Sequence, residues 1–334
     1  MTHRASHRKF LAVAGTIAAV ATGLMAFHQP AKADLSTSEG IERCATRVSI
    51  AFTGKSDPTL AKTQNPQTAI DTLLNRDDFQ DRFARFINSK FNRDPGANAS
   101  EDAAYHMAKY VLVNGLPWHT MFDGQLSVKA ADLTKPNDNV TVTQDDNGLG
   151  IFRSPAWVDR YRGNELSGLK LVSAFRMQQN IIGLELIAST NAPGADLSAT
   201  GRQNSACSGC HYDNWYALDK VANVLMRKKV DAKGNEVRQN NMYVYDKPTS
   251  GPQQIFGQSV DGSDGDGDKK VVAALLASDM YKYRTCRLAM NFLYGRDEVK
   301  CEGPLFDKCV DDFTKYGTIQ SALSVIAKDT SFCQ

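Results

Sequence analysis

The apolar side chains of this chain recur mostly at the spacing of a buried helix face. Between residues 68 and 87 most of them stand three or four positions apart, and arginines and aspartates fill the positions between them. This pattern predicts a helical segment whose apolar stripe faces a core. The stripe is rich in phenylalanine, and we interpret it as packing surface rather than as a cofactor site. It consists of Ile70, Leu73, Leu74, Phe79, Phe83, Phe86 and Ile87.

The same spacing predicts helices elsewhere, and breaks in it predict turns and strands. Ser36 or Ser38 is expected to cap the first helix, and Ser100 a later one that has acidic residues in its first turn. Residues 140–142 form a short β-prone run, and residues 230–246 alternate like a hairpin that turns at 233–235. The predicted fold class is therefore mainly α, with one or two short hairpins. The expected helices span 34–54, 68–87, 100–113, 165–187, 218–229, 271–276, 281–294 and 318–332.

The first 33 residues have the composition of an export signal rather than of a folded element. A basic start precedes an apolar stretch over residues 11–27, and Ala31-Lys32-Ala33 is an A-x-A cleavage site before Asp34. No later run reaches the roughly 18 apolar residues that a membrane-spanning helix needs. We therefore expect a cleaved signal peptide over residues 1–33 and a periplasmic or extracellular protein without a transmembrane anchor.

The charge balance changes when that segment is removed. The full chain carries a formal net charge of +2, and residues 1–33 hold Arg4, Arg8, Lys9 and Lys32 but no acidic residue. Subtracting these four from 39 basic residues leaves 35 against 37 acidic ones, a net charge of −2. Neither this balance nor the distribution of basic and aromatic residues indicates nucleic-acid binding. The remaining length is sufficient for one large or two modest domains.

One short motif carries most of the chemical information. Cys207-Ser208-Gly209-Cys210-His211 spells C-x-x-C-H, the attachment signature of a c-type haem. Two thiols three positions apart at the start of a helix can each form a thioether to one vinyl group of the same porphyrin. The histidine that follows is then the proximal ligand of the iron. The motif therefore predicts one covalently attached haem c, held by Cys207 and Cys210 and ligated by His211.

The sequence leaves the second axial ligand open. Methionine or histidine there would give a six-coordinate haem suited to electron transfer, whereas an open position would admit peroxide or oxygen. Met242 and Met177 are the candidates, ranked equally, although the helical spacing around Met177 also fits a core position. His106 and His119 are the only other histidines after residue 33, and each is more typical of a structural role.

Five cysteines remain outside the motif, and an exported protein is expected to pair four of them. A bridge between Cys301 and Cys309 would close a short loop, and one between Cys286 and Cys333 would join two helices, leaving Cys44 free. Other pairings of the same residues are equally compatible with the sequence.

Residues 261–268 alternate aspartate with glycine and serine, like the first half of an EF-hand loop. The glutamate expected later is missing, because Val272 and Ala273 stand in that region. We therefore interpret this segment as a flexible acidic loop rather than as a calcium site.

Three groups of segments resemble the large, functionally uncharacterised c-type cytochromes of planctomycetes and related bacteria, in which helical domains surround a C-x-x-C-H. The resemblance implies a helical architecture around a haem but no particular activity. This chain is shorter than most of those proteins and lacks their proline-rich run before the motif, where only Pro193 stands. The segments are 47–54 with 73–86, 151–155 with 207–211 and 217–219, and 292–296 with 316–332.

These observations together predict a domain organisation and a function. The expected parts are a helical domain over 34–150, a cytochrome-c-like haem-binding region over 151–270 and a disulfide-stapled helical region over 271–334. The expected function is one-electron transfer between periplasmic redox proteins, because one haem without a second redox motif favours a carrier over a catalyst.

Three alternatives stay open. The first is a peroxidase-like enzyme or oxidase component in which His106, Arg176 or Arg202 serves an open distal side. The second is a structural subunit of a cell-surface complex. The third is a thiol–disulfide site made by the cysteine pair alone.

Overall fold

The computed structural model describes residues 35–96, 102–132, 139–163, 168–186, 194, 196–239 and 242–334. The predicted signal peptide, the predicted cap Ser100 and both ends of the helix expected over 165–187 lie outside these residues. The described part is mainly helical, as predicted. Its α-helices are α1 (Ser38–Thr53), α2 (Ile70–Leu73), α3 (Asp77–Phe91), α4 (Ala103–Val113), α5 (Thr120–Asp123), α6 (Pro155–Arg160), α7 (Leu171–Ile182), α8 (Ala199–Arg202), α9 (Ser205–Ser208), α10 (Leu218–Val224), α11 (Gly267–Leu276), α12 (Asp279–Tyr294), α13 (Gly303–Tyr316) and α14 (Ile319–Lys328).

The first helix shows how local sequence sets the ends of an element. The hydroxyl of Thr37, not that of Ser36 or Ser38, accepts a hydrogen bond from the Gly40 N–H at 3.0 Å. Thr37 has an extended backbone, which lets its side chain reach that amide. The helix ends where Gly54 adopts a left-handed conformation with φ 77°. The predicted helix is therefore confirmed and its predicted cap is wrong by one residue.

The phenylalanine stripe is core, as predicted. Phe79 and Phe83 of α3 are fully buried, and Phe86 is partly buried at the edge. The ring of Phe292 from α12 lies 5.0 Å from that of Phe83 and 5.4 Å from that of Phe86, centroid to centroid. Trp118 completes the cluster edge-on to Phe83. Aromatic packing therefore joins α3 to a helix about two hundred residues later.

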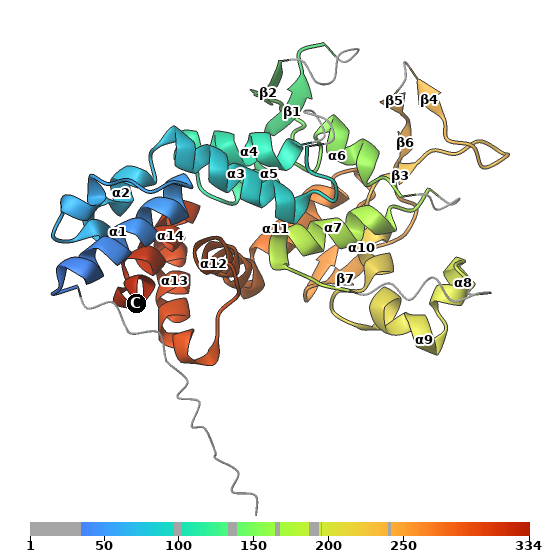
Figure 1. The fold of residues 1–334 in the computed structure, drawn as a ribbon. Coiled ribbons are helices and arrows are strands. Elements are labelled where there is room, and N and C mark those ends of the chain that lie inside the picture. The colour runs from blue at the N-terminus through green and yellow to red at the C-terminus, as the bar shows by residue number, and fades with distance from the viewer. Residues whose placement is uncertain are drawn as a thin grey trace, which may run out of the picture. The chain divides into compact units, whose positions relative to one another are not determined.

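The last helices of the chain pack against the first ones (Figure 1). Cys44 in α1 is bonded to Cys333. The guanidinium of Arg47 donates to the Gln334 carbonyl at 2.8 Å, and the buried Gln67 amide donates to the Ala327 carbonyl at 2.6 Å. The helices predicted at the two ends of the sequence thus share one hydrophobic core.

The disulfide pairing differs from the expected one. The bonds are Cys44–Cys333 and Cys286–Cys309, and Cys301 is free and exposed. Cys286 and Cys309 lie on the buried faces of α12 and α13, which pack together. Cys301 lies in a single exposed 3-10 turn, so a short separation from Cys309 did not bring the two thiols together. Only one bridge is therefore internal to residues 271–334.

The strands form antiparallel pairs of two. β1 (Leu126–Ala130) pairs with β2 (Val140–Gln144), which confirms the β-prone run at 140–142. The predicted hairpin over 230–246 also forms, but its pairing falls in two places. A tight turn at 231–235 is closed by a Val230–Glu236 bridge, and β4 (Arg238–Gln239) pairs with β5 (Met242–Tyr243). The remaining strands are β3 (Arg227–Lys228), β6 (Tyr245–Asp246), β7 (Gln253–Ile255) and β8 (Gln258–Val260), of which β3 pairs with β6 and β7 with β8.

The acidic segment 261–268, interpreted as a flexible loop, is held against the body of the protein. Arg153 donates to both oxygens of Asp268, at 2.7 and 2.5 Å, and to Asp266 at 2.9 Å. Lys270 donates to Asp264 at 2.6 Å. Because Arg153 is more than a hundred residues away in sequence, the charge pattern of the loop alone gave no sign of this partner.

Helix α7 connects the parts of the chain that the sequence suggested as separate domains. It contacts α3 from the first part, α10 from the second, and α11 and α12 from the third. Its buried residues Ala174, Met177 and Ile181 belong to the same core as the phenylalanine cluster. The division into 34–150, 151–270 and 271–334 stays a prediction. For the site, α7 provides the surface on which α10 packs.

Candidate functional site

The C-x-x-C-H motif lies in one continuous helical segment beside α10. Asn204 accepts a hydrogen bond from the Ala206 N–H and begins α9, which continues into a π-helical turn over Gly209–Asp213. Cys207 and Cys210 are both partly exposed and neither forms a disulfide. Two free thiols thus lie about one turn apart at the surface, followed directly by His211.

His211 is oriented by a buried carboxylate. Its Nδ1 lies 2.6 Å from Oδ2 of Asp219, which is 1% exposed and belongs to the first turn of α10. An ionised carboxylate can only accept hydrogen bonds, so Nδ1 carries a proton, and in the neutral imidazole Nε2 keeps its lone pair. Among the described residues no hydrogen bond is made by Nε2. The ring therefore presents one nitrogen to Asp219 and offers the other as a ligand.

Two further side chains hold the Asp219 carboxylate. Arg202, itself 9% exposed, donates to Oδ1 at 2.9 Å, and the Tyr212 hydroxyl donates to the same oxygen at 3.1 Å. Burial raises the pKa of the Asp219 carboxyl, but the hydrogen bonds from His211 and Arg202 outweigh it and bring the pKa below its ordinary value. The Arg202 guanidinium also donates to the Leu197 carbonyl at 2.7 Å, which ties the chain before α8 to α10.

Exposed apolar side chains flank the motif. Leu197 is 59% exposed and Trp215 is 46% exposed, although soluble proteins usually bury such residues. The Trp215 ring packs edge-on against Tyr216 and Phe256, with centroids 5.0 and 5.3 Å away, so its position is fixed. The donor set fits a porphyrin, because it consists of two free thiols and one imidazole nitrogen without a partner among the described residues.

The other residues considered from the sequence lie in varied surroundings. Met177, on α7, is 2% exposed and belongs to the hydrophobic core of the protein. Met242 pairs with Gln239 in the β4–β5 hairpin, and its side chain lies outside the described part of the structure. His119 is exposed and its Nδ1 lies 2.8 Å from Asp123. The second axial ligand of the expected haem stays a prediction.

Two of the residues proposed for a distal side have other partners. The Arg176 guanidinium lies 5.1 Å from the centre of the Tyr161 ring. His106 packs edge-on against Tyr105 in α4. Arg202, the third candidate, binds Asp219, the carboxylate that orients His211.

Asp219 is the site residue that sequence reasoning missed. It stands eight residues after His211, and this separation by itself predicts no contact. Asp219 reaches the ring only because the chain turns between the π-helical turn and α10. The one signal available was an acidic residue in the first turn of a helix that follows the motif.

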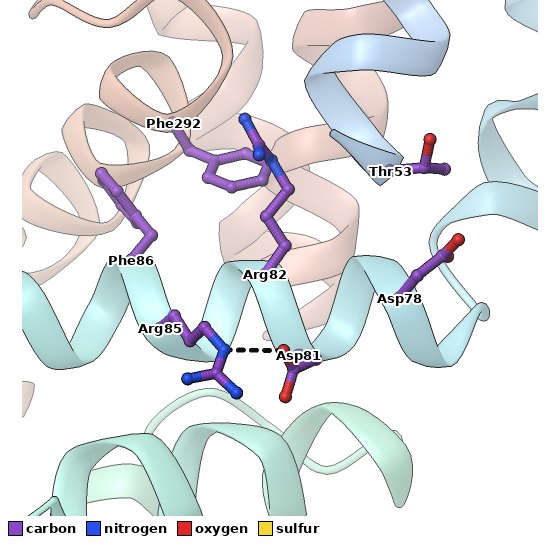
Figure 2. A pocket seen from close by; sticks show the side chains of 7 residues that line it. All are labelled: Thr53, Asp78, Asp81, Arg82, Arg85, Phe86 and Phe292. Atoms are coloured by element: carbon purple, nitrogen blue, oxygen red, sulfur yellow. Dashed lines mark hydrogen bonds and ion pairs between the residues drawn. The ribbon is translucent and has the colours of Figure 1, made fainter. Parts of the chain in front are cut away.

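A surface groove lies elsewhere, between α3, the end of α1 and α12 (Figure 2). Arg85 is paired with Asp81 at 2.8 Å, and the Arg82 guanidinium lies 5.8 Å from the centre of the Phe292 ring. Arg82 also donates to the Ala51 carbonyl. The groove holds none of the motif residues, and its arginines already have partners in the protein. Its lining is Thr53, Asp78, Asp81, Arg82, Arg85, Phe86 and Phe292.

Comparison with family models, with curated proteins and with solved structures found no match to this chain. Within the described ranges no helix is long and apolar enough to cross a membrane. The same part of the chain contains no cluster of three or more histidine, cysteine and acidic side chains arranged to bind a metal ion.

Proposed function

We propose that this chain is an exported monohaem c-type cytochrome that passes single electrons between redox proteins outside the cytoplasm. The observation that carries the proposal is the arrangement of Cys207, Cys210 and His211: two free thiols on one helical segment beside a histidine whose Nδ1 is already bound. Cys207 and Cys210 would hold the porphyrin and Nε2 of His211 would ligate the iron. When bound, the haem supplies the one-electron couple.

The residues of the chain then have defined tasks. Cys207 and Cys210 would hold the porphyrin at a partly exposed surface, which would suit exchange of electrons with a partner protein. Asp219 fixes the tautomer and the orientation of His211. Leu197 and Trp215 would lie against the apolar macrocycle and limit its contact with water.

The cysteine inventory supports the compartment. Two disulfides are typical of proteins that fold in an oxidising environment, and the predicted signal segment would bring the chain there. Cys207 and Cys210 are unbridged in the structure, as thiols that are to bond to a porphyrin must be.

A haem stain tests the proposal directly. The full chain would be produced in a host that attaches c-type haem, purified from the periplasm, denatured and stained. We expect a stained band, a processed chain that begins at Asp34, and loss of the stain in Cys207→Ala/Cys210→Ala. Cys301→Ala is the matched control, since it removes an exposed free thiol and should keep the stain. Exported, correctly processed wild-type protein without stain would refute the proposal and favour the thiol–disulfide alternative.

The optical spectrum then separates a carrier from an enzyme. A low-spin spectrum that carbon monoxide does not change supports the electron carrier, because both axial positions are filled. A high-spin ferrous form that shifts with carbon monoxide would overturn the carrier in favour of a haem enzyme with an open distal side.

A further inference from the structure

The Asp219 carboxylate, which accepts a hydrogen bond from Nδ1 of His211, would affect how strongly the histidine donates to a bound iron. This property goes beyond the proposed function. The Nδ1–Oδ2 distance of 2.6 Å is short for an N–H···O bond, and the acceptor is an ionised group with almost no access to water. At such a site salt and solvent screen the interaction much less than they screen an exposed pair.

We infer that Asp219 is a positioning residue that lowers the reduction potential of the haem by making His211 a more strongly donating ligand. A hydrogen bond from Nδ1 to a carboxylate moves electron density onto the imidazole and raises the basicity of Nε2. A more basic ligand stabilises ferric iron more than ferrous iron, because the ferric ion carries the larger charge. The inference rests on the proposed function, since it requires that His211 ligates a haem.

Arg202 and Tyr212 limit this effect. Both donate to Oδ1 of the same carboxylate, so they compete with His211 for its negative charge. Removal of either donor should therefore make Asp219 a stronger acceptor and the potential lower still. Loss of the Tyr212 hydroxyl is the sharper probe, because it leaves the net charge of the protein unchanged.

A purely structural role for Asp219 predicts a different outcome. As a buried partner of Arg202, the carboxylate could serve only to hold α8 against α10. Its replacement would then change stability, and the potential would respond only to the lost charge. Asp213 provides the matched control for charge: it stands two residues after His211, is exposed, and its side chain makes no hydrogen bond among the described residues.

The experiment is an optical redox titration of the haem-loaded protein and its Asp219→Asn, Asp213→Asn and Tyr212→Phe variants. Substitution of a residue that hydrogen-bonds a metal ligand typically changes the metal affinity by about 10- to 100-fold. We expect Asp219→Asn to shift the ferric–ferrous equilibrium at least about tenfold toward ferrous haem, a rise of about 59 mV for one electron. Asp213→Asn should leave the midpoint nearly unchanged, and Tyr212→Phe should lower it.

The outcomes separate this inference from the proposed function. A haem-loaded wild type whose midpoint moves equally in Asp219→Asn and Asp213→Asn overturns the inference and leaves the cytochrome intact. If Asp219→Asn accumulates no holoprotein, Tyr212→Phe decides: a lower midpoint supports the inference, and an unchanged or higher one overturns it. Wild-type protein without haem in the denatured stain refutes the proposed function, and the inference with it.

Discussion

The two disulfides should stabilise the fold to different degrees. We consider two double variants, Cys44→Ala/Cys333→Ala and Cys286→Ala/Cys309→Ala. All four sulfur atoms belong to buried residues, with exposures of 0%, 3%, 0% and 0%. Each variant therefore removes the same atoms from similar surroundings, so the loss of packing is similar. What differs is the length of chain that each bond closes.

The expected magnitudes follow from the sequence separations. Cys44 and Cys333 are 289 residues apart, whereas Cys286 and Cys309 are 23 apart. Because a cross-link removes entropy from the unfolded chain in proportion to the logarithm of the loop length, the long loop contributes about 5–6 kcal/mol and the short one about 3.5 kcal/mol. These values are upper limits, since structure left in the unfolded state reduces both. The difference of about 2 kcal/mol is the firmer quantity.

Equilibrium unfolding in urea without reductant measures this difference. The free energy of unfolding is the product of the midpoint and the slope, and both double variants are compared with the unaltered protein. We expect the larger loss in Cys44→Ala/Cys333→Ala, and a change within about 0.5 kcal/mol in Cys301→Ala, which removes an exposed free thiol. An equal loss in both double variants, or a larger loss in Cys286→Ala/Cys309→Ala, would refute the loop-entropy reasoning.

Three further predictions concern the pH response, a glycine and the core. Burial lowers the pKa of Lys170 to about 8, so between pH 8 and the ordinary value of 10.5 the unfolded chain binds more protons and stability should rise with pH. The free energy of unfolding should rise by at most about 3 kcal/mol, because the Lys170 side chain keeps some exposure. Urea unfolding at several pH values should show this rise in the wild type but not in Lys170→Met. Gly168→Ala should lower the stability by roughly several kcal/mol, because a Cβ there would lie 2.0 Å from the Lys228 carbonyl oxygen. Gly295→Ala is the control: Gly295 has the same φ of +73° but open space around it, so the substitution should cost only about 1 kcal/mol. Equal melting temperatures of the two variants would contradict the steric argument. Phe83→Ala should lower the free energy of unfolding in urea by about 3–5 kcal/mol, because Phe83 is fully buried among the rings of Phe79, Trp118 and Phe292. Phe86→Ala should lower it clearly less, since Phe86 is only partly buried. Equal losses in the two variants would contradict this reasoning.

The sequence by itself determined what depends on neighbours along the chain. Helical periodicity identified the stripe from Ile70 to Ile87 and its buried face, since side chains three and four residues apart share one side of a helix. The single helix expected over 68–87 is wrong, because α2 ends at Leu73 and α3 begins at Asp77. It also identified the strand at 140–142. The C-x-x-C-H spacing identified Cys207, Cys210 and His211 as candidates, because thioether attachment needs those residues within about one helical turn.

The tertiary structure decided everything that depends on segments distant in sequence. The pairing of Cys44 with Cys333 follows from the packing of α1 against the last residues, and Arg153 meets the acidic loop across more than a hundred residues. Asp219 reaches His211, and Arg202 reaches Asp219, only because α8 and α10 converge on the motif. No local pattern encodes such contacts, because they result from how the core as a whole is filled. The candidate ligand set was therefore readable in the sequence, and the residues that surround it were not.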